Sequence, residues 1–384
     1  MQTNLIIYND VKEFGGHEVL TLHLIKYLLQ EESCKIHFIC SARNKKLLIS
    51  LNILMKEVGR DFNITAISYS SGKLQLLRTF LSIIAILRVR KKIKQIAPGC
   101  VLVAQGEISL STVGILAAKL SGIKVVSYIP MAHSRVKRGD RYFPKLKDRI
   151  LSFYYSLPSA FITISKSVQQ ELIGRGALQS IKVVHNGIDI DSYEFVEKAD
   201  ARKKLGLEEN EYIIGLVGRI EFNQKQQDLF IKVMAKRKHE LQNTKILMVG
   251  NGPDEVVLDS LIKNFGMQDY VEILPWHENL SDVYSAIDLI AIPSKFEGLP
   301  IVMLEAMLYK LPVIASNVDG MAEILPREWL FDCRNEEEIW ETFKRVSNGD
   351  NDKCLNSHYE LVKKYYSIEN FRKSFYDELS SICS

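Results

Sequence analysis

Two carboxylates with seven residues between them, Glu297 and Glu305, form the most informative pattern in the sequence. The apolar run before Glu297 is typical of a buried strand, and Gly298 and Pro300 predict a turn that leads into a helix. Residues 301–308 have almost no polar side chains, which indicates that this helix is buried. One carboxylate is therefore expected on the loop and the other within the helix, near the same face. Because a buried carboxylate needs hydrogen-bond donors, the pattern favours a ligand with sugar or ribose hydroxyls.

Three other loops after expected strands combine glycine with polar or charged residues. Gly15-Gly16 opens a helix, where free backbone amides favour an anion. Gly218-Arg219, with Lys225 six residues further on, places two cations after the first strand of the second half. Gly250-Asn251-Gly252-Pro253 follows the next strand. Each loop alone is also typical of a tight turn, but four in register, with the Glu297 segment, argue against a purely structural explanation.

Strand-like and helix-like segments alternate along the whole chain, which predicts an α/β fold with parallel sheets covered by helices. In the first half the expected strands are Asn4–Tyr8, Lys35–Ile39, Ile64–Ile67, Cys100–Ala104, Lys124–Tyr128, Ala160–Ile164 and Lys182–His185. In the second half they are Tyr212–Val217, Lys245–Val249, Val271–Leu274, Leu289–Ile292 and Pro312–Ala315. Helices are expected between the strands, for example over Val19–Leu29 and Thr112–Leu120.

The alternation divides the chain into two doubly wound, Rossmann-like domains. Residues 1–190 are expected to form the first domain and residues 191–365 the second, followed by a terminal segment, 366–384. The acidic and polar composition from Asn186-Gly187-Ile188-Asp189 to about Asn210 predicts an interdomain linker. Two such domains facing each other would hold a ligand in a cleft between the carboxyl ends of their sheets.

The net charge of +4 conceals a strong asymmetry between the two halves. Residues 1–190 carry 27 Lys and Arg against 12 Asp and Glu, a net charge of +15, whereas residues 191–384 carry a net charge of −11. No acidic residue occurs between Asp61 and Glu107. Such a one-sided field predicts an anionic partner: a phospholipid surface, a nucleic acid or a phosphorylated substrate. A nucleic acid is disfavoured because no recognised binding motif accompanies the charge.

Two basic segments are candidates for contact with a membrane or with an acceptor molecule. Their candidate residues are Arg88, Arg90, Lys91 and Lys92 in the first segment and Arg135, Lys137 and Arg138 in the second. The apolar run 74–89 is too short, and too interrupted by Arg78, to span a bilayer. Its flanking cations suit a helix that lies at an anionic interface. The alternative is an ordinary buried helix followed by a solvated basic end.

The composition fits a cytosolic protein with two domains of ordinary size. The 384 residues can form two hydrophobic cores, and 47% hydrophobic and 25% charged residues are typical of globular proteins. The six cysteines form no Cys-x-x-Cys pair and no zinc-like cluster, so we expect reduced thiols. The first residues lack the basic start and long apolar run of a signal peptide, so we expect a cytoplasmic location. The two basic segments add the expectation that the protein is peripheral at the inner face of the cell membrane.

Together, the motifs resemble those of the retaining glycosyltransferases of family 4, which have the GT-B architecture of two facing Rossmann-like domains. The matching segments are Gly15-Gly16, His185–Asp189, Gly218-Arg219 with Lys225, Gly250–Pro253, Phe296–Pro300 and Leu304–Ala306. The segment from Tyr366 to Tyr376 resembles the closing helix of that family, which packs back on the first domain. Two positions depart from the family pattern: Gln226 stands where the family has glycine after the lysine, and Asp319-Gly320 stands where it has Gly-Gly.

The resemblance implies transfer of a sugar from a nucleoside diphosphate to an acceptor hydroxyl, with retention of the anomeric configuration. It assigns Arg219 and Lys225 to the two phosphates. It assigns Glu297 to a hydroxyl of the transferred sugar and Glu305 to the donor ribose. The alternative for Glu305 is a helix carboxylate that is bonded only within the protein.

The resemblance also implies a division of labour between the domains, in which the basic first domain binds the acceptor and the second binds the nucleotide sugar. In the first domain, the amides of Gly15 and Gly16 would approach the sugar and the acceptor, and His133 would lie beside the donor sugar. The other donor-binding positions are Gly218, Asn251, Gly298, Leu299 and Pro300. A pair of cations at the two phosphates suits a metal-independent reaction, so neither a metal ion nor another cofactor is expected.

The leading hypothesis is a membrane-associated glycosyltransferase that extends a polysaccharide or glycolipid on a lipid-diphosphate or glycan acceptor. The same fold could instead serve a small soluble acceptor. A third hypothesis is a non-catalytic basic scaffold with a degenerate nucleotide pocket. An NAD-dependent oxidoreductase is disfavoured because Gly15-Gly16 lacks the Gly-x-Gly-x-x-Gly spacing.

Overall fold

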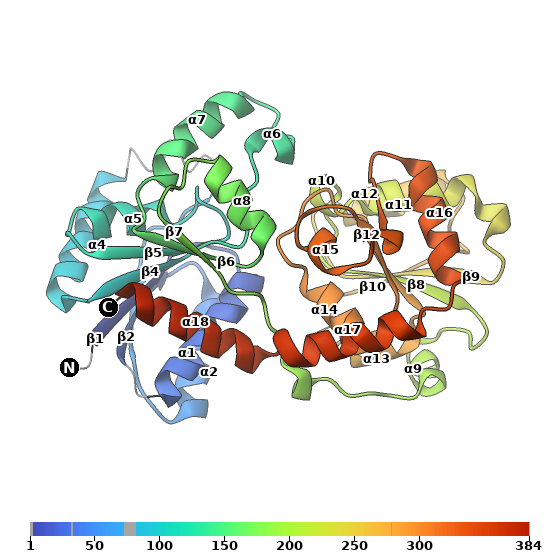
Figure 1. Cartoon of the computed structure of the whole chain (residues 1–384), viewed down its shortest axis with the longest axis horizontal. Coiled ribbons are helices and arrows are strands. Elements are labelled where there is room, and N and C mark those ends of the chain that lie inside the picture. The colour runs from blue at the N-terminus through green and yellow to red at the C-terminus, as the bar shows by residue number, and fades with distance from the viewer. Residues whose placement is uncertain (1–2, 32–33, 73–81, 278, 384) are drawn as a thin grey trace. The chain divides into compact units, whose positions relative to one another are not determined.

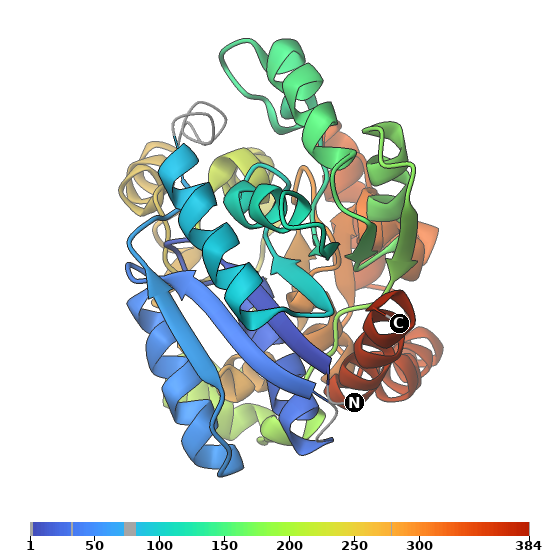
Figure 2. The ribbon, with the colours of Figure 1, turned by 90° about the vertical axis from the view of Figure 1, so that its left-hand side faces the viewer.

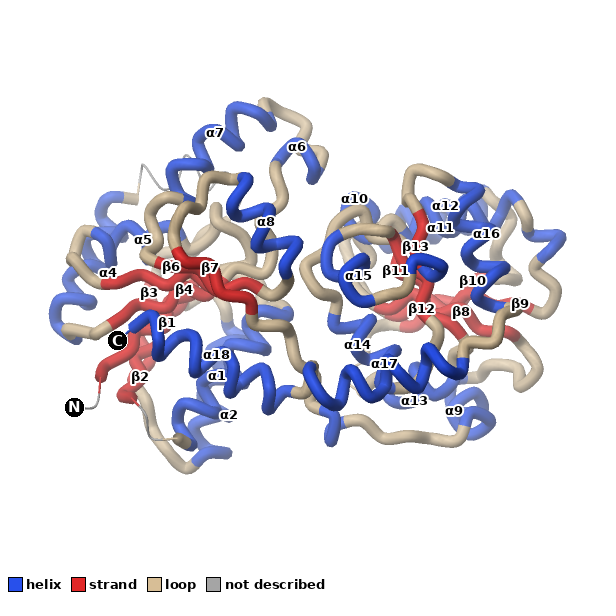
Figure 3. Tube along the Cα trace, in the orientation of Figure 1, coloured by secondary structure: helices blue, strands red, loops and turns tan. Residues whose placement is uncertain are grey.

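A computed structural model describes residues 3–31, 34–72, 82–277 and 279–383. The chain divides into two compact units: unit 1 is Met1–Asn186 with Glu369–Ser384, and unit 2 is Gly187–Ile368. Each unit is built on one parallel sheet with helices on both faces (Figures 1 and 3). The α/β class with two Rossmann-like domains is therefore confirmed.

The sheet of unit 1 has seven strands in the order β3-β2-β1-β4-β5-β6-β7, and all described pairings are parallel. The strands are β1 (Thr3–Asn9), β2 (Cys34–Ser41), β3 (Asn63–Ile67), β4 (Cys100–Ala104), β5 (Lys124–Tyr128), β6 (Ala160–Thr163) and β7 (Ser180–Val183). Strands β4 and β6 are buried along their whole length, as expected for a parallel sheet covered on both faces.

The helices of unit 1 are α1 (Gly16–Gln30), α2 (Lys45–Val58), α4 (Ile83–Ile96), α5 (Thr112–Lys119), α6 (Arg135–Arg138), α7 (Pro144–Tyr155), α8 (Lys166–Gly174) and α18 (Ile368–Cys383). Figures 1 and 2 show α1 and α2 on one face of the sheet and α4 and α5 on the other. The last helix, α18, packs its aromatic side chains on unit 1. The Phe375 ring lies 5.0 Å from that of Tyr128, and the Tyr376 ring lies 5.8 Å from that of Tyr27.

Gly114 allows α5 to lie close to β1. A Cβ atom at this position would come within 2.3 Å of the ring of Tyr8, which is completely buried. The Tyr8 hydroxyl donates a 2.7 Å hydrogen bond to the buried carboxylate of Asp10, so the ring is not free to move aside. Only glycine therefore fits at this point of the core.

We expect Gly114→Ala to lower the free energy of unfolding of unit 1 by about 1–3 kcal/mol, because it overpacks this contact. Urea unfolding measures the loss. Gly174→Ala, at a position with no atom within 4 Å of the added carbon, is the matched control and should be close to neutral. Equal stability of the two variants would contradict the packing described for Tyr8.

The sheet of unit 2 has six strands in the order β10-β9-β8-β11-β12-β13, again with parallel pairings. The strands are β8 (Tyr212–Val217), β9 (Thr244–Val249), β10 (Val271–Leu274), β11 (Leu289–Ile292), β12 (Val313–Ser316) and β13 (Leu330–Phe331). The α-helices are α9 (Lys198–Leu205), α10 (Phe222–Lys225), α11 (Gln227–Lys236), α12 (Glu255–Asn264), α13 (Ser281–Ala286), α14 (Ile301–Leu308), α15 (Asp319–Ile324), α16 (Glu336–Ser347) and α17 (Asp352–Tyr365). Short 3-10 helices are η1 (Ile190–Ser192), η2 (Lys238–Glu240) and η3 (Arg327–Trp329).

The segment after Asp189, which was expected to be an interdomain linker, is instead a folded part of unit 2. It contains η1 and α9. Arg202 of α9 is 4% exposed, and its guanidinium pairs with the Asp288 carboxylate at 2.6 Å. The polar composition therefore reflects a helix that is anchored by a buried ion pair rather than an open connection.

Smaller corrections concern the ends of elements. Strand β7 covers Ser180–Val183 rather than Lys182–His185, and β13, which has two residues, was not predicted. The expected interfacial run 74–89 is described from Ser82 onward, where α4 begins at Ile83, and its earlier residues lie outside the described part of the chain.

Candidate functional site

Both sheets reverse their strand order beside their first strand, between β1 and β4 in unit 1 and between β8 and β11 in unit 2. In open α/β sheets, ligands bind at the carboxyl ends of the strands at such a switch point, because the loops there diverge and leave a crevice. In unit 2 the loops after β8 and β11 carry Gly218-Arg219 and Glu297. The topology therefore brings these two motifs, about 80 residues apart in sequence, to the same place.

Lys225 and Glu297 form an ion pair at this switch point. The Lys225 Nζ lies 2.6 Å from Glu297 Oε1, and the two side chains are 24% and 8% exposed. The α10 segment also binds the β11 loop through its backbone, because the Lys295 amide donates to the Gln224 carbonyl at 2.8 Å. The residue predicted to bind a phosphate, Lys225, and the residue predicted to bind a sugar hydroxyl, Glu297, are thus adjacent.

The β11 loop is fixed from its other side by the start of α15. The Asp319 carboxylate accepts a 2.8 Å hydrogen bond from the Glu297 amide, and the Gly320 amide donates to the Gly298 carbonyl at 3.0 Å. A Cβ atom on Gly320 would lie 2.4 Å from that carbonyl oxygen. The position of Glu297 therefore depends on a contact that requires glycine at 320.

The loops after β8 and β9 touch each other through bare backbone. A Cβ atom on Gly250 would lie 2.0 Å from the Gly218 carbonyl oxygen, and Gly218 and Gly250 have φ angles of 137° and 152° that favour glycine. Asn251 connects these loops to the end of β10, since its side-chain oxygen accepts a 2.9 Å hydrogen bond from the Trp276 amide. Gly218 and Asn251, both predicted to bind the donor, thus fix the contacts among the loops at the carboxyl ends of β8, β9 and β10.

Arg219 is the most exposed of the predicted catalytic residues. Its side chain is 65% exposed, and a guanidinium nitrogen lies 3.5 Å from the Glu221 carboxylate. Its carbonyl accepts a 2.8 Å hydrogen bond from the Gln227 side chain, so the backbone is fixed while the side chain extends into solvent. Among the described residues, no ion pair joins Arg219 to Glu297.

The turn before α14 has the expected form. Leu299 is buried and Pro300 is the N-cap of α14, whose range of Ile301–Leu308 is the one predicted. No side chain in the described part of the chain caps this helix. Its positive end is therefore available to an anion.

Glu305 is buried within α14, and each of its carboxylate oxygens accepts a hydrogen bond from a tyrosine. The Tyr193 hydroxyl donates to Oε1 at 2.5 Å, and the Tyr284 hydroxyl donates to Oε2. Burial raises the pKa of the Glu305 carboxyl, while the two phenol hydrogen bonds act in the opposite direction. The contacts are those of the alternative in which Glu305 is bonded within the protein, but a carboxylate has room for further donors on both oxygens.

Unit 1 places Gly15 and Gly16 at the carboxyl end of β1, but the amide of Gly15 is not free as expected. It donates a 2.8 Å hydrogen bond to the buried carboxylate of Glu18, which also accepts from the Asn9 side chain at 3.0 Å. The φ angle of Gly15 is −149°, and a Cβ atom on Gly16 would have no atom within 4 Å. Neither the backbone conformation nor the internal packing described here requires these glycines.

His133 lies in the loop after β5 and is 6% exposed. The next residue, Ser134, caps α6 by accepting a 2.9 Å hydrogen bond from the Lys137 amide. The histidine is therefore held at the carboxyl edge of the sheet of unit 1, the edge on which Gly15 and Gly16 also lie.

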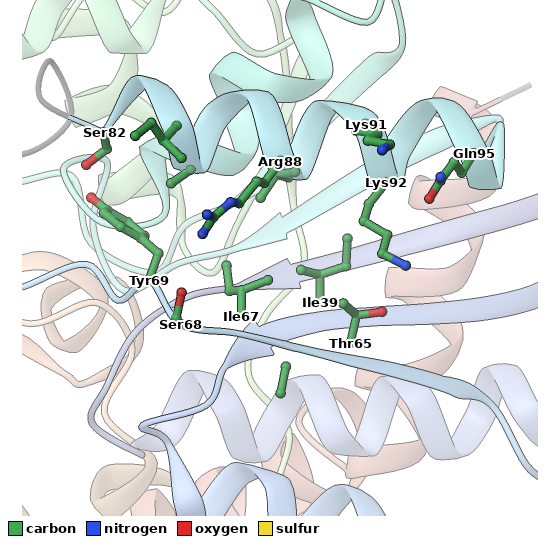
Figure 4. A pocket seen from close by; sticks show the side chains of 14 residues that line it. Ile39, Thr65, Ile67, Ser68, Tyr69, Ser82, Arg88, Lys91, Lys92 and Gln95 are labelled. Atoms are coloured by element: carbon green, nitrogen blue, oxygen red, sulfur yellow. The ribbon is translucent and has the colours of Figure 1, made fainter.

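Three of the four predicted cations of α4 line a cavity, and the fourth binds the end of α5. Arg88, Lys91 and Lys92 are exposed and line a cavity of about 740 Å³ between α4 and the β3 side of the sheet. Figure 4 shows Arg88 and Lys92 reaching from α4 toward that side. The walls of this cavity include apolar residues of both α4 and β3, among them Ile67 of β3. Arg90 instead donates a 3.0 Å hydrogen bond to the Leu120 carbonyl at the end of α5.

The cations predicted in α6 have acidic partners within unit 1. Arg135 lies 2.6 Å from the Glu107 carboxylate, which also pairs with Arg138, and Lys137 lies 3.0 Å from the Glu171 carboxylate. Much of their charge is therefore used inside the protein. These three residues and Arg90 are thus the four predicted membrane or acceptor residues that bind other groups of unit 1.

Four residues at these sites were not predicted. Asp319, Tyr193 and Tyr284 hold Glu297 and Glu305, and Trp276 is a half-exposed aromatic residue at the end of β10. The sequence had a signal for Asp319, which departs from the family pattern, and for Trp276, which follows a predicted strand. The tyrosines are distant in sequence from Glu305 and gave no local signal.

Two Rossmann-like units, with a paired cation and carboxylate at the switch point of the second, define the chain as a member of the GT-B class. A family described as "Glycosyltransferase Family 4" matches residues 14–192, and one described as "Glycosyl transferases group 1" matches residues 197–360. The chain belongs to the family-4 GT-B glycosyltransferases.

Relatives and solved structures agree with this membership. The chain is 30% identical over 225 residues to an uncharacterized glycosyltransferase of Methanocaldococcus jannaschii, a match that covers 55% of this chain and 57% of that protein. It is 35% identical over 148 residues to the D-inositol 3-phosphate glycosyltransferase of Mycobacteroides abscessus, covering 37% of this chain and 32% of that protein. The chain thus matches about half or less of the length of these relatives. Anabaena HepE, solved with UDP and glucose, shares the fold over 99% of this chain and 100% of its own, with a TM-score of 0.77 and 18% identity.

Proposed function

We propose that the chain is a retaining glycosyltransferase that moves a sugar from a nucleoside-diphosphate sugar to a hydroxyl of a lipid-linked or glycan acceptor, in polysaccharide or glycolipid biosynthesis. The observation that carries the proposal is the Lys225–Glu297 pair at the switch point of unit 2, fixed by the Asp319 and Gly320 contacts. A cation beside a carboxylate suits a donor that presents a phosphate next to a sugar hydroxyl. The solved HepE complex with UDP and glucose gives the same kind of ligand for a protein of this fold.

The difficult step is departure of the diphosphate from the sugar, because negative charge develops on the leaving oxygen. Lys225, the exposed Arg219 side chain and the positive end of α14 can all stabilise that charge. Two side-chain cations can neutralise a diphosphate, so the proposed chemistry requires no metal ion. The bond from the anomeric carbon to the diphosphate breaks, the acceptor oxygen bonds on the same face, and its proton passes to the diphosphate.

The two carboxylates would bind different parts of the donor. Glu297 accepts from a hydroxyl of the sugar when Lys225 turns to the phosphates. Glu305 accepts from the ribose, while Tyr193 and Tyr284 hold its carboxylate in place. Trp276, at the carboxyl edge of the same sheet, offers an aromatic face on which the base can stack.

Unit 1 would supply the acceptor side. The residue type at Gly15 and Gly16 is explained neither by a left-handed backbone nor by close packing, which favours a role in leaving space for a ligand. His133 lies at the same edge of that sheet. The cavity beside α4 joins apolar walls to Arg88, Lys91 and Lys92, which suits an amphiphilic acceptor with a phosphate group.

We also propose a cytoplasmic location, peripheral on the inner face of the cell membrane, with the α4 cations facing anionic lipid. In the ranges that the structure describes, no helix has both the length and the apolar character needed to cross a bilayer. A second candidate function uses a small soluble acceptor. The similarity to a D-inositol 3-phosphate glycosyltransferase supports that alternative.

A panel of nucleoside diphosphates tests the donor site directly. A ligand at 100 times its Kd stabilises the folded protein by about 2.7 kcal/mol, which raises Tm by roughly 5–10 °C for a unit of this size. We expect UDP, GDP or ADP to produce such a shift. The same nucleotide should also change the tryptophan fluorescence. That change would report on the half-exposed Trp276, because Trp329 and Trp340 are buried.

Arg219→Ala should weaken binding of that nucleotide by roughly 10- to 100-fold, the loss of affinity expected when a hydrogen bond to a charged group is removed. Arg327→Ala is the matched control, because the Arg327 side chain is also 65% exposed and also pairs with a glutamate. The proposal fails if no nucleotide shifts Tm. The phosphate assignment alone fails if both arginine variants bind like the wild type.

A further inference from the structure

The outer face of α7 carries an unusual set of exposed apolar side chains. Tyr142 and Phe143 at its start, and Leu146, Ile150 and Phe153 along it, are between 37% and 75% exposed. We call these five residues the α7 stripe. Soluble proteins seldom gather large apolar side chains in this way unless the surface binds something.

The stripe has the geometry of an amphipathic helix. At about 100° per residue, Leu146, Ile150 and Phe153 fall within a sector of about 60°. The side chains that face the core, Leu151, Tyr154 and Tyr155, are buried and lie on a different sector. The helix is therefore already packed on unit 1, and the stripe is a second apolar surface that faces away from that core.

The charge beside the stripe is positive. Lys145 and Arg149 occupy the sector next to it, and Arg141 precedes the helix; all three are exposed and have no acidic partner in the described ranges. The two acidic residues of the region are already paired, Asp140 with Lys147 at 2.8 Å and Asp148 with Arg175 at 2.5 Å. Cations therefore border the stripe without acidic residues to balance them.

This combination selects the occupant. Aromatic and aliphatic side chains on one sector, with Lys and Arg on the next, suit the boundary between acyl chains and anionic headgroups. A second copy of the chain is a poorer fit, because a two-fold contact through α7 would bring the Lys145 and Arg149 residues of both copies together. An anionic bilayer neutralises those cations instead.

We propose that α7 is the membrane-inserting element of this protein, with the α7 stripe among the acyl chains and Arg141, Lys145 and Arg149 at the lipid phosphates. Figures 1 and 2 place the N-terminal end of α4 toward the same end of unit 1 as α7. That end of α4 carries the exposed Ile83, Ile84 and Leu87, which would widen the apolar contact. The inference refines the peripheral location in the proposed function, but it rests on α7 itself and not on the donor site.

The test uses the full chain and vesicles of phosphatidylcholine with or without phosphatidylglycerol. The variant Phe143→Ser, Leu146→Ser, Phe153→Ser should partition at least 10-fold more weakly onto anionic vesicles, and its exposed positions should leave Tm unchanged. Lys145→Glu with Arg149→Glu should remove the preference for anionic over neutral vesicles and its dependence on salt. Leu178→Ser with Val256→Ser, at residues 91% and 79% exposed elsewhere, is the matched control.

The outcomes separate this inference from the donor site. Wild-type partitioning by the triple serine variant would overturn the role of α7, as would a wild type that ignores anionic vesicles. Self-association that the triple variant abolishes, with no vesicle binding, would assign the stripe to a second copy instead. The nucleotide-induced Tm shift should be the same in every variant, so its loss in the wild type would count against the glycosyltransferase proposal and not against α7.

Discussion

Replacing Gly320 with alanine should reduce kcat/KM by about 100-fold or more, a loss expected when a catalytic group is misplaced by about 1 Å. The added carbon would lie 2.4 Å from the Gly298 carbonyl oxygen, an atom of the backbone that cannot rotate away. Relief of the contact must move either α15 or the β11 loop. Movement of the loop displaces Glu297, and movement of α15 removes the Asp319 carboxylate from the Glu297 amide. The measurement is turnover of the nucleotide sugar that best stabilises the wild type.

The control for this variant is Ala322→Ser, which adds one atom to an exposed position on the same helix. It should keep wild-type turnover. Thermal unfolding of both proteins separates a local displacement from a general loss of structure. Wild-type turnover by a folded Gly320→Ala protein would show that the position of the β11 loop does not limit the reaction.

Changing Glu305 to glutamine should separate activity from stability. We expect kcat/KM to fall by roughly 10- to 100-fold, because a carboxylate that accepts ribose hydroxyls contributes more than a neutral amide does. At neutral pH the variant should unfold no more easily than the wild type, since the amide avoids the cost of a buried charge. Glu360→Gln, on the exposed face of α17, is the control for both measurements.

The pH dependence of this effect has a defined sign. Burial raises the pKa of Glu305 in the folded protein above its ordinary value of 4.5. The folded state therefore holds this proton more tightly than the unfolded chain, and its contribution to stability is complete below pH 4.5 and declines as pH rises through the folded pKa. The wild type should lose stability relative to Glu305→Gln across that interval in urea titrations. A constant difference between the two proteins would remove Glu305 as its source.

Much of the fold could be read from the sequence because parallel strands are buried on both faces and appear as short apolar runs. Strands β8, β10 and β11, and helix α14, have the predicted bounds. The exceptions have physical causes. Strand β13 is too short to form a run. Helix α9 has no apolar stripe, because its buried residues are the small Ala201 and the arginine Arg202.

The site was predictable in its motifs but not in its contacts. Glycine loops with charged residues, and the glutamate pair, pointed to the switch point because four such loops follow expected strands in register. The pairing of Lys225 with Glu297 depends on strand order, which brings β8 beside β11. The tyrosines around Glu305 and the exposed stripe on α7 depend on which face each side chain occupies in three dimensions. No local pattern carries that information.

Gln226 and Asp319 have φ angles of 51°, in a region that glycine occupies with least strain, and both stand where the family pattern has glycine. They lie on opposite sides of the Lys225–Glu297 pair. A side chain kept in such a conformation costs of order 1–3 kcal/mol. The protein therefore has backbone strain on both sides of one small polar cluster. A glycine at either position would relieve that strain and raise the resistance to thermal unfolding, but it would make the backbone beside the cluster less rigid.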